Sequence, residues 1–384
     1  MTFPFEALRR HPDVEGPGLV AADAADRLLL DESAATRAGA APGEVVVIGD
    51  DYGALTLGAA WEGDGDRGQG GVRGIRVHQD ALTGERALER NAATLGLSEA
   101  FTSLPLLDAA SVAGARVVLL RLPRSLDALR DAAGLVAAHA APDVVLFAGG
   151  RIKHMTPAMN DVLRETFARV DITHARQKSR VLVARGPHDG RDPAPAASQA
   201  DGLELRAFGG TFGGARLDHG TRLLLEALGA GGGPRVGGTA EDPWLDLACG
   251  NGSIGAWLAT RHPAGHVWSS DQSAVAVASA RATAAANGVT ERMEVVRDDA
   301  LSIRPDASAS LVTLNPPFHS GAAVTDRIAP HLFADATRAL RPGGELWCVW
   351  NSPLGYRPVL ERLVGPTRQA ARDRRFTVTV STRR

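Results

Sequence analysis

Short apolar runs alternate with alanine-rich stretches along the second half of the chain. The runs are WLDLA, HVWSSD, MEVVRDD, SLVTLNPP and GELWCVW, and stretches such as SIGAWLATR and SAVAVASARATAAANG separate them. Runs of this length predict strands, and strands that alternate with helices are typical of a doubly wound, mainly parallel sheet. The period-two sequence RRFTVTVST near the end of the chain predicts a terminal strand.

The first half of the chain contains a weaker copy of this pattern. Gly53 matches Gly252 at an offset of 199, and Leu97 matches Val289 at an offset of 192. Two matches with similar offsets indicate an internal duplication of one α/β domain. We expect DVVLFAGGRIKHM, residues 143–155, to occupy the place of SLVTLNPPFHSG, with Ala148 at the position of Asn315.

Segments rich in glycine, proline and aspartate interrupt the two halves. Residues 185–202 offer little to a packed core and mark the best domain boundary, which predicts domains over 1–190 and 200–384. Residues 62–71 predict a solvated loop, and residues 229–243 predict a second flexible segment before the strand at Trp244.

Composition narrows the class of protein. A net charge of −2 argues against a surface that is basic throughout, although a local basic patch remains possible. The two cysteines, Cys249 and Cys348, have no metal-site spacing, so we expect buried thiols, no metal and a reducing compartment. The absence of a signal-like N-terminus and of an 18-residue apolar run predicts a cytoplasmic protein without a membrane span.

A glycine-rich loop follows the first predicted strand of the second half. In DLACGNGSIG, Gly250, Gly252 and Gly255 form G-x-G-x-x-G before a predicted helix. Glycines allow a tight turn and close approach of a ligand to a helix N-terminus. The motif alone also fits a nicotinamide enzyme or a purely structural turn.

Acidic residues end the next two predicted strands. Asp271 can accept hydrogen bonds from both ribose hydroxyls of a nucleoside cofactor, and Asp299, beside Asp298, can accept one from an adenine amino group. Doubly wound sheets bind ligands at these carboxyl ends. Solvated strand ends are the alternative interpretation.

The fourth predicted strand stops at Asn-Pro-Pro-Phe. Pro316 and Pro317 cannot extend a sheet ladder. The Asn315 side-chain oxygen and the Pro316 carbonyl can each accept one hydrogen from a planar amino group, and Phe318 offers a stacking face for its ring. Two fixed acceptors favour pyramidalisation of that nitrogen and aim its lone pair at an electrophile.

Together these motifs resemble S-adenosylmethionine-dependent N-methyltransferases, and NPPFH resembles the bacterial ribosomal RNA guanine-N2 methyltransferase family. The resemblance implies two tandem Rossmann-like methyltransferase domains, the N-terminal one degenerate. It places Asp246 and Thr221, the latter in LDHGTR, with Gly250, Gly252, Asp271 and Asp299 at the cofactor, although Thr221 also fits a helix N-cap. Ala248 departs from the glycine that often begins the cofactor loop.

The degenerate copy lacks the residues of a cofactor site. Asp50 and Asp51 stand in its glycine loop, and only Asp80 is expected to survive there from the acidic strand ends. We therefore expect the N-terminal domain to hold RNA rather than S-adenosylmethionine. The candidate RNA contacts are Arg151, Lys153, His154, Arg176, Lys178 and Arg180.

The leading prediction is methyl transfer from S-adenosylmethionine to guanine N2 in ribosomal RNA or an assembled ribosomal subunit, by a monomeric enzyme. An adenine-N6 or small-amine methyltransferase, a non-catalytic RNA-binding or assembly factor, and a nicotinamide oxidoreductase are the alternatives. The sequence does not specify the guanine or the choice between 16S and 23S RNA.

Overall fold

The computed structural model describes residues 2–61, 71–230, 233–234, 236–317 and 322–384, and the predicted loop over 62–71 falls almost wholly outside them. The described chain divides into a first unit, Met1–Ala194, and a second unit, Pro195–Arg384. Each unit contains a seven-stranded sheet. Among the described residues, no helix combines the length and the apolar content needed to cross a membrane.

The first unit has the strand order β3-β2-β1-β4-β5-β7-β6. Its strands are β1 (Val45–Ile48), β2 (Ile75–His78), β3 (Phe101–Leu104), β4 (Val117–Arg121), β5 (Val145–Arg151), β6 (Phe167–Ile172) and β7 (Ser179–Pro187). Its helices are η1 (Phe5–Ala7), α1 (Ala24–Arg37), α2 (Ala54–Ala60), α3 (Leu82–Leu95), η2 (Ser98–Ala100), α4 (Ala109–Val112), α5 (Leu126–His139), η3 (Ile152–His154) and α6 (Pro157–Arg164).

The second unit repeats that order as β12-β11-β10-β13-β14-β16-β15. Its strands are β10 (Trp244–Leu247), β11 (Val267–Asp271), β12 (Met293–Arg297), β13 (Ala309–Leu314), β14 (Leu340–Asn351), β15 (Thr367–Arg372) and β16 (Phe376–Thr382), preceded by the hairpin of β8 (Ala196–Ala200) and β9 (Leu203–Ala207). Its helices are α7 (His219–Ala230), α8 (Ser253–Arg261), α9 (Ala274–Ala286), α10 (Ala322–Ala339), η4 (Ser352–Leu354) and α11 (Arg357–Leu363).

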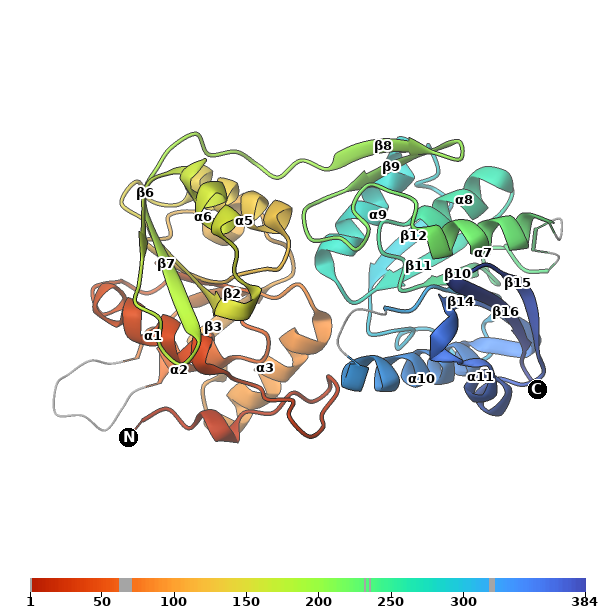
Figure 1. Ribbon diagram of the computed structural model, residues 1–384, viewed down its shortest axis with the longest axis horizontal. Coiled ribbons are helices and arrows are strands. Elements are labelled where there is room, and N and C mark those ends of the chain that lie inside the picture. Colours follow the sequence, from red (N-terminus) through yellow and green to blue (C-terminus); the bar gives the residue numbers. More distant parts are fainter. Residues whose placement is uncertain (1, 62–70, 231–232, 235, 318–321) are drawn as a thin grey trace. The chain divides into compact units, whose positions relative to one another are not determined.

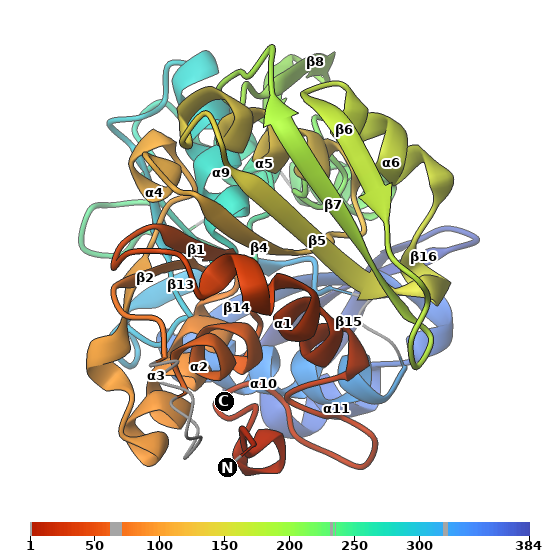
Figure 2. The same ribbon diagram turned by 90° about the vertical axis from the view of Figure 1, so that its left-hand side faces the viewer.

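Apolar side chains cover both faces of each sheet. In the second unit, α7, α8 and α9 pack in one cluster and α10 and α11 in another. In the first unit, α1, α2 and α3 cover one face and α4, α5 and α6 the other, an arrangement visible in Figure 2 on either side of β5 and β7. The neighbouring strands are parallel except where β7 or β16 joins the sheet, so the predicted fold class, two doubly wound, mainly parallel α/β sheets, is confirmed (Figure 1).

Part of the predicted linker is ordered strand. β7 ends at Pro187, and β8 forms within the stretch that we expected to contribute little to packing. β8 pairs with β9. Two backbone N–H groups of β9 donate to side chains at the C-terminal end of α9: Arg206 N to Thr283 Oγ1 at 3.0 Å and Glu204 N to Asn287 Oδ1 at 3.0 Å. A hydrophobicity pattern does not reveal the pairing of a mostly exposed strand, so β8 was not predicted.

The repeated topology corrects two expected equivalences. β1 pairs with β4 through Ile48–Leu120, and β10 pairs with β13 through Leu247–Leu314, so β4 corresponds to β13. Arg121, the residue after Leu120, therefore stands at the position of Asn315, and the expectation for Ala148 is wrong because β5 corresponds to β14.

The acidic end of β11 also has a different counterpart from the one expected. Val46 pairs with Arg76 as Leu245 pairs with Trp268, which aligns Gln79, rather than Asp80, with Asp271. The error is one residue, and in a strand a shift of one residue moves a side chain to the opposite face.

Candidate functional site

The glycine loop joins β10 to α8 through three residues in the left-handed region of backbone conformation. Ala248, Gly250 and Gly252 have φ values of 57°, 55° and 76°. An L-residue is strained at such angles by about 1–2 kcal/mol, so Ala248 occupies a position that glycine suits better. The alanine at position 248 therefore adds local backbone strain and does not give the loop a different shape.

Glycine stands at each of the three motif positions for a different physical reason. A Cβ atom on Gly252 would lie 2.8 Å from Cβ of Ala280, and one on Gly255 would lie 2.6 Å from Oγ of Ser269. These two glycines allow α8 to pack closely on α9 and on the sheet. A Cβ atom on Gly250 would meet nothing within 4 Å among the described residues, so this glycine leaves open space above the loop.

Asp246, which we assigned to the cofactor site, lies inside the protein. Its side chain is fully buried, and Oδ2 accepts a hydrogen bond from the Gly255 backbone N–H at 2.9 Å. Burial raises the pKa of Asp246 to about 7, opposed by the Gly255 hydrogen bond and reinforced by the charge of Asp271. Asp246 thus braces the start of α8 below the loop.

Asp271 lies at the carboxyl end of β11, beside the glycine loop. Its Oδ2 accepts from the Gly250 backbone N–H at 3.0 Å, and its Oδ1 accepts from the Ser273 backbone N–H at 3.0 Å. These two bonds fix the orientation of the carboxylate beside the glycine loop. The N–H of Gly250 is used by Asp271, which means that this glycine contributes room rather than a free donor.

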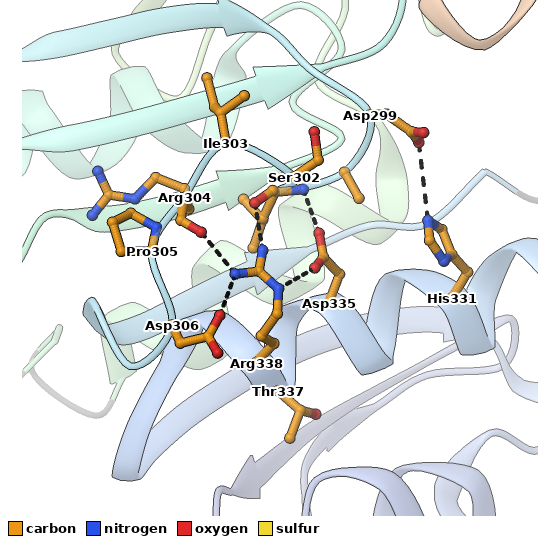
Figure 3. Close-up of polar contacts among 12 residues, drawn as sticks. Asp299, Ser302, Ile303, Arg304, Pro305, Asp306, His331, Asp335, Thr337 and Arg338 are labelled. Atoms are coloured by element: carbon orange, nitrogen blue, oxygen red, sulfur yellow. Dashed lines mark hydrogen bonds and ion pairs between the residues drawn. The ribbon is translucent and has the colours of Figure 1, made fainter. Parts of the chain in front are cut away.

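The pair at the end of β12 divides into an inner and an outer residue. Asp298 is buried and accepts from Ser302 Oγ at 2.5 Å and from the Ile303 backbone N–H at 3.1 Å. Asp299 is partly exposed and lies 3.9 Å from His331 Nε2 (Figure 3). Asp299 is therefore the member of the pair that a ligand can reach.

An arginine of α10 holds the segment that follows Asp299. Arg338 donates to the carbonyl oxygens of Leu301 at 2.6 Å and Arg304 at 2.7 Å, and its Nε donates to Asp335 at 2.7 Å. Asp335 in turn accepts from the Leu301 backbone N–H at 2.7 Å. Figure 3 shows this network, which the sequence pattern did not predict.

Asn315 follows β13 and is held by two residues at the start of α7. Its Nδ2 donates to Asp218 Oδ2 at 3.1 Å and to Thr221 Oγ1 at 2.9 Å. Its Oδ1 is buried and has no hydrogen-bond partner among the described residues. A buried acceptor without a partner is costly, so a hydrogen-bond donor that reached this oxygen would bind favourably.

The remaining residues of the proline turn are described only in part. Pro316 is buried and Pro317 is exposed. Phe318, predicted as the stacking residue, and His319 lie outside the described residues.

The sequence missed one residue of the glycine loop that organises its surroundings. Asn251 donates through Nδ2 to the carbonyl oxygens of Gly214 at 2.9 Å and Arg216 at 3.0 Å, and its Oδ1 accepts from the Ser253 backbone N–H at 3.2 Å. It fastens the chain that leads to Asp218 onto the loop. An asparagine between two motif glycines was the available signal.

Cys249, within the loop, is a buried thiol. Burial raises its pKa well above the ordinary value, and the charges of Asp271 and Asp246 act in the same direction. A protonated buried thiol is a poor nucleophile, so packing accounts for it.

The basic residues considered for RNA binding gather at the carboxyl end of β5 in the first unit. Arg151 pairs with Ser179, Gly150 pairs with Arg180, and the Ile152 backbone N–H donates to the Lys178 carbonyl at 2.9 Å. Arg176 forms an ion pair with Asp31. The other five candidates, Arg151, Lys153, His154, Lys178 and Arg180, have no ion pair within the described residues.

The pKa of His154 reports the crowding of positive charge at this edge. Desolvation lowers it, and the charges of Arg124, Lys153 and Arg151 lower it further. A nearby anion would act against this shift, because it stabilises the charged form of the ring.

Comparison with known proteins gives matches over nearly the whole chain. Residues 202–380 match the Methyltransferase small domain, and residues 2–188 match the RLMG N-terminal domain. A protein of Streptomyces avermitilis, Ribosomal RNA large subunit methyltransferase G, is 35% identical over 98% of this chain and 97% of its own length. A protein of the same name in Shewanella amazonensis is 33% identical over 97% of this chain and 94% of its own.

One solved structure has a similar fold throughout. It is the T. thermophilus 16S rRNA N2 G1207 methyltransferase in complex with AdoMet and guanosine, with a TM-score of 0.72, 21% identity and coverage of 97% of both chains. At this identity the likeness concerns the fold, and it includes both units.

Proposed function

We propose a function for this chain from one premise: it belongs to the ribosomal RNA large subunit methyltransferase G family. It is an S-adenosylmethionine-dependent methyltransferase of ribosomal RNA, as its motifs predicted. Membership of this family excludes the alternative function of a nicotinamide oxidoreductase. Its name also specifies the large subunit, a choice that the sequence left open.

The target atom that we propose is the exocyclic N2 of a guanine in large-subunit RNA. The observation that carries this proposal is the buried, unpartnered Oδ1 of Asn315 at the carboxyl end of β13. A carbonyl-type oxygen in that place suits an N–H donor, and an exocyclic amine supplies two. The T. thermophilus protein of the same fold is named for guanine N2, which agrees with this choice.

S-adenosylmethionine supplies an electrophilic methyl group on a sulfonium. The amine nitrogen attacks that carbon with its lone pair, the carbon–sulfur bond breaks with its electrons remaining on sulfur, and one amine proton passes to water. Asn315 Oδ1 and the Pro316 carbonyl hold the two amine hydrogens, so the lone pair is withdrawn from the ring and directed at the methyl carbon. Phe318 is proposed to stack on the base.

We propose that the cofactor occupies the space that Gly250 leaves open. Asp271, fixed by two backbone N–H groups, accepts from the ribose hydroxyls, and Asp299 accepts from the adenine amino group. Gly250 and Gly252 shape the loop, which Asp246 braces from below. Thr221 is proposed to lie near the methionine end of the cofactor, with its hydroxyl engaged by Asn315 Nδ2 at 2.9 Å.

We further propose that the second unit carries out catalysis and that the first unit does not bind the cofactor. Asp51, with φ 57°, stands at the position of Gly250, so this loop carries a side chain where the loop of the second unit has none. At the position of Asn315, Arg121 donates to both oxygens of Asp23 at 3.0 Å and to Asp26 at 2.6 Å. An ion-paired arginine has no acceptor for an amine.

The first unit is proposed to bind RNA through the basic edge formed by β5, η3 and β7. The five candidates without an ion pair there can contact phosphates without first breaking a bond to a carboxylate. We also propose that the enzyme acts as a monomer in the cytoplasm, where ribosomal RNA is made and assembled in bacteria.

Two measurements on the purified protein test the proposed chemistry. Asn315→Ala is expected to slow single-turnover methyl transfer to large-subunit RNA by about 10²–10³, because one transition-state hydrogen bond is lost. Calorimetry should show cofactor affinity nearly unchanged, since Asn315 lies past the strands that bind the cofactor. Wild-type turnover by this variant would refute the proposed role of Asn315.

A further inference from the structure

The start of α7 brings two polar residues to Asn315 from almost a hundred positions earlier in the chain. Asp218 caps this helix: its Oδ2 accepts from the Thr221 backbone N–H at 3.1 Å. The same Oδ2 atom accepts from Asn315 Nδ2, and Thr221 Oγ1 accepts the second bond from that nitrogen. Thr221 is buried, with 4% of its surface exposed, so its hydroxyl has little competition from water.

These contacts fix which way the Asn315 amide faces. A carboxylate oxygen accepts hydrogen bonds and cannot donate them, so the amide group that faces Asp218 must be the NH₂. The oxygen is then turned away from α7, into the position where it lacks a partner. Rotation of the amide by half a turn would place its oxygen against the carboxylate and abolish the hydrogen bond to Asp218.

Several further bonds hold the start of α7 in place. Asn251 fastens residues 214 and 216 to the glycine loop, as described above. His219 Nε2 lies 2.7 Å from Asp373 Oδ2, in the turn between β15 and β16. Asp218 therefore reaches Asn315 from a segment that is anchored on both the cofactor loop and the sheet.

We propose that Asp218 and Thr221 are positioning residues for methyl transfer, which orient the Asn315 amide so that its oxygen faces the target amine. The proposal rests on the function proposed above and assigns these two residues to the amine rather than to the cofactor alone. The charge of Asp218 has a second effect. A hydrogen bond from Nδ2 to a carboxylate makes the amide oxygen more negative, which strengthens its bond to an amine that becomes positive during transfer.

Three variants separate geometry, charge and helix capping. Thr221→Val has nearly the same shape but removes one acceptor, and we expect single-turnover methyl transfer to slow by about 3- to 10-fold. Asp218→Ala removes the other acceptor, the charge and the cap, and we expect a loss of about 30- to 100-fold. Asp218→Asn keeps an oxygen able to accept both bonds, caps as well as aspartate does, and should lose at most about 5-fold.

The decisive readout is non-additivity with Asn315→Ala. If both residues act through the amide, Thr221→Val and Asp218→Asn should have no further effect on the rate of the Asn315→Ala enzyme. Cofactor dissociation constants from calorimetry should stay within about 3-fold of wild type in the Thr221→Val and Asp218→Asn enzymes. A Thr221→Val change that slows both backgrounds equally, or that weakens the cofactor in parallel with the rate, would overturn the proposal.

Two matched controls address general destabilisation. Asp108→Ala removes a similar N-cap from α4 of the first unit, where Asp108 accepts from the Ser111 backbone N–H at 3.0 Å. Thr367→Val removes a buried hydroxyl from β15. Both should lower thermal stability without changing the rate of methyl transfer, and comparable rate losses in the controls would assign the effects to folding.

Failure of this inference is distinguishable from failure of the proposed function. A slow Asn315→Ala enzyme with Thr221→Val and Asp218→Ala at wild-type rates would leave the function intact and remove the positioning role. An Asn315→Ala enzyme with wild-type turnover would remove the function assigned to Asn315 and the positioning role together.

Discussion

Replacement of Asp271 by alanine tests the cofactor site most sharply, because this carboxylate has both a structural and a binding task. It accepts from the backbone N–H groups of Gly250 and Ser273, each at 3.0 Å, and it is proposed to accept from two ribose hydroxyls. Loss of two charge-assisted hydrogen bonds to the cofactor costs about 2–4 kcal/mol in binding. The dissociation constant should therefore rise by about 30- to 1000-fold.

The assay is calorimetric titration with S-adenosylmethionine and with its demethylated product. Part of the Asp271→Ala loss could come from a loosened glycine loop, so Asp271→Asn serves as the second variant. Asparagine keeps one acceptor oxygen, and its dissociation constant should rise by only about 10-fold. Five of the six tryptophans lie in the second unit, so their fluorescence checks that this unit is folded. A folded Asp271→Ala protein whose affinity stays within about 3-fold of wild type would refute the cofactor assignment.

Three further predictions, which use four substitutions, concern other parts of the structure. Gly250→Ala should cost only about 1–2 kcal/mol of stability, since its Cβ meets open space, yet it should block cofactor binding in calorimetry. Gly252→Ala also overpacks α9 and should cost about 2–5 kcal/mol in urea unfolding. Equal effects of the two variants on binding and on stability would contradict this division. Arg121→Ala leaves the buried Asp26 without its ion-pair partner and should destabilise the first unit by about 3–5 kcal/mol while leaving cofactor affinity unchanged. A second cofactor site in the calorimetric stoichiometry would contradict the account of that unit. Because burial raises the pKa of Asp246 to about 7 above an unfolded value near 4, the native state binds the extra proton, and its contribution to stability should fall as pH rises across that window. Relative to Asp246→Asn, wild-type stability should drop by about 1.4 kcal/mol per pH unit there, and parallel pH profiles would contradict it.

Sequence patterns predicted those features of the protein that depend on residues close together in the chain. Alternation of apolar runs and helical stretches predicted the two sheets, since each run buries both faces of a parallel strand. The glycine motif predicted the turn that Gly250 and Gly252 make. The proline pair predicted the end of β13, because proline has no N–H for the ladder.

Contacts between distant residues escaped the sequence for the opposite reason. The bonds from Asn315 to Asp218 and Thr221 span 97 and 94 residues, so no spacing rule relates them. The equivalence of Arg121 with Asn315 depends on strand pairing, and the expectation for Ala148 followed a similarity in sequence to the wrong strand. β15 carries the polar sequence TRQAAR, which has no apolar alternation to reveal it.

The identity of the modified atom is the central claim, and mass spectrometry of nucleosides from large-subunit RNA tests it most directly. Cells that lack this protein should lose one N2-methylguanosine from that RNA. The wild-type gene should restore it, and the Asn315→Ala gene should leave it largely absent. An unchanged N2-methylguanosine content in the cells without the protein, or the loss of a methylated adenine instead, would contradict the account.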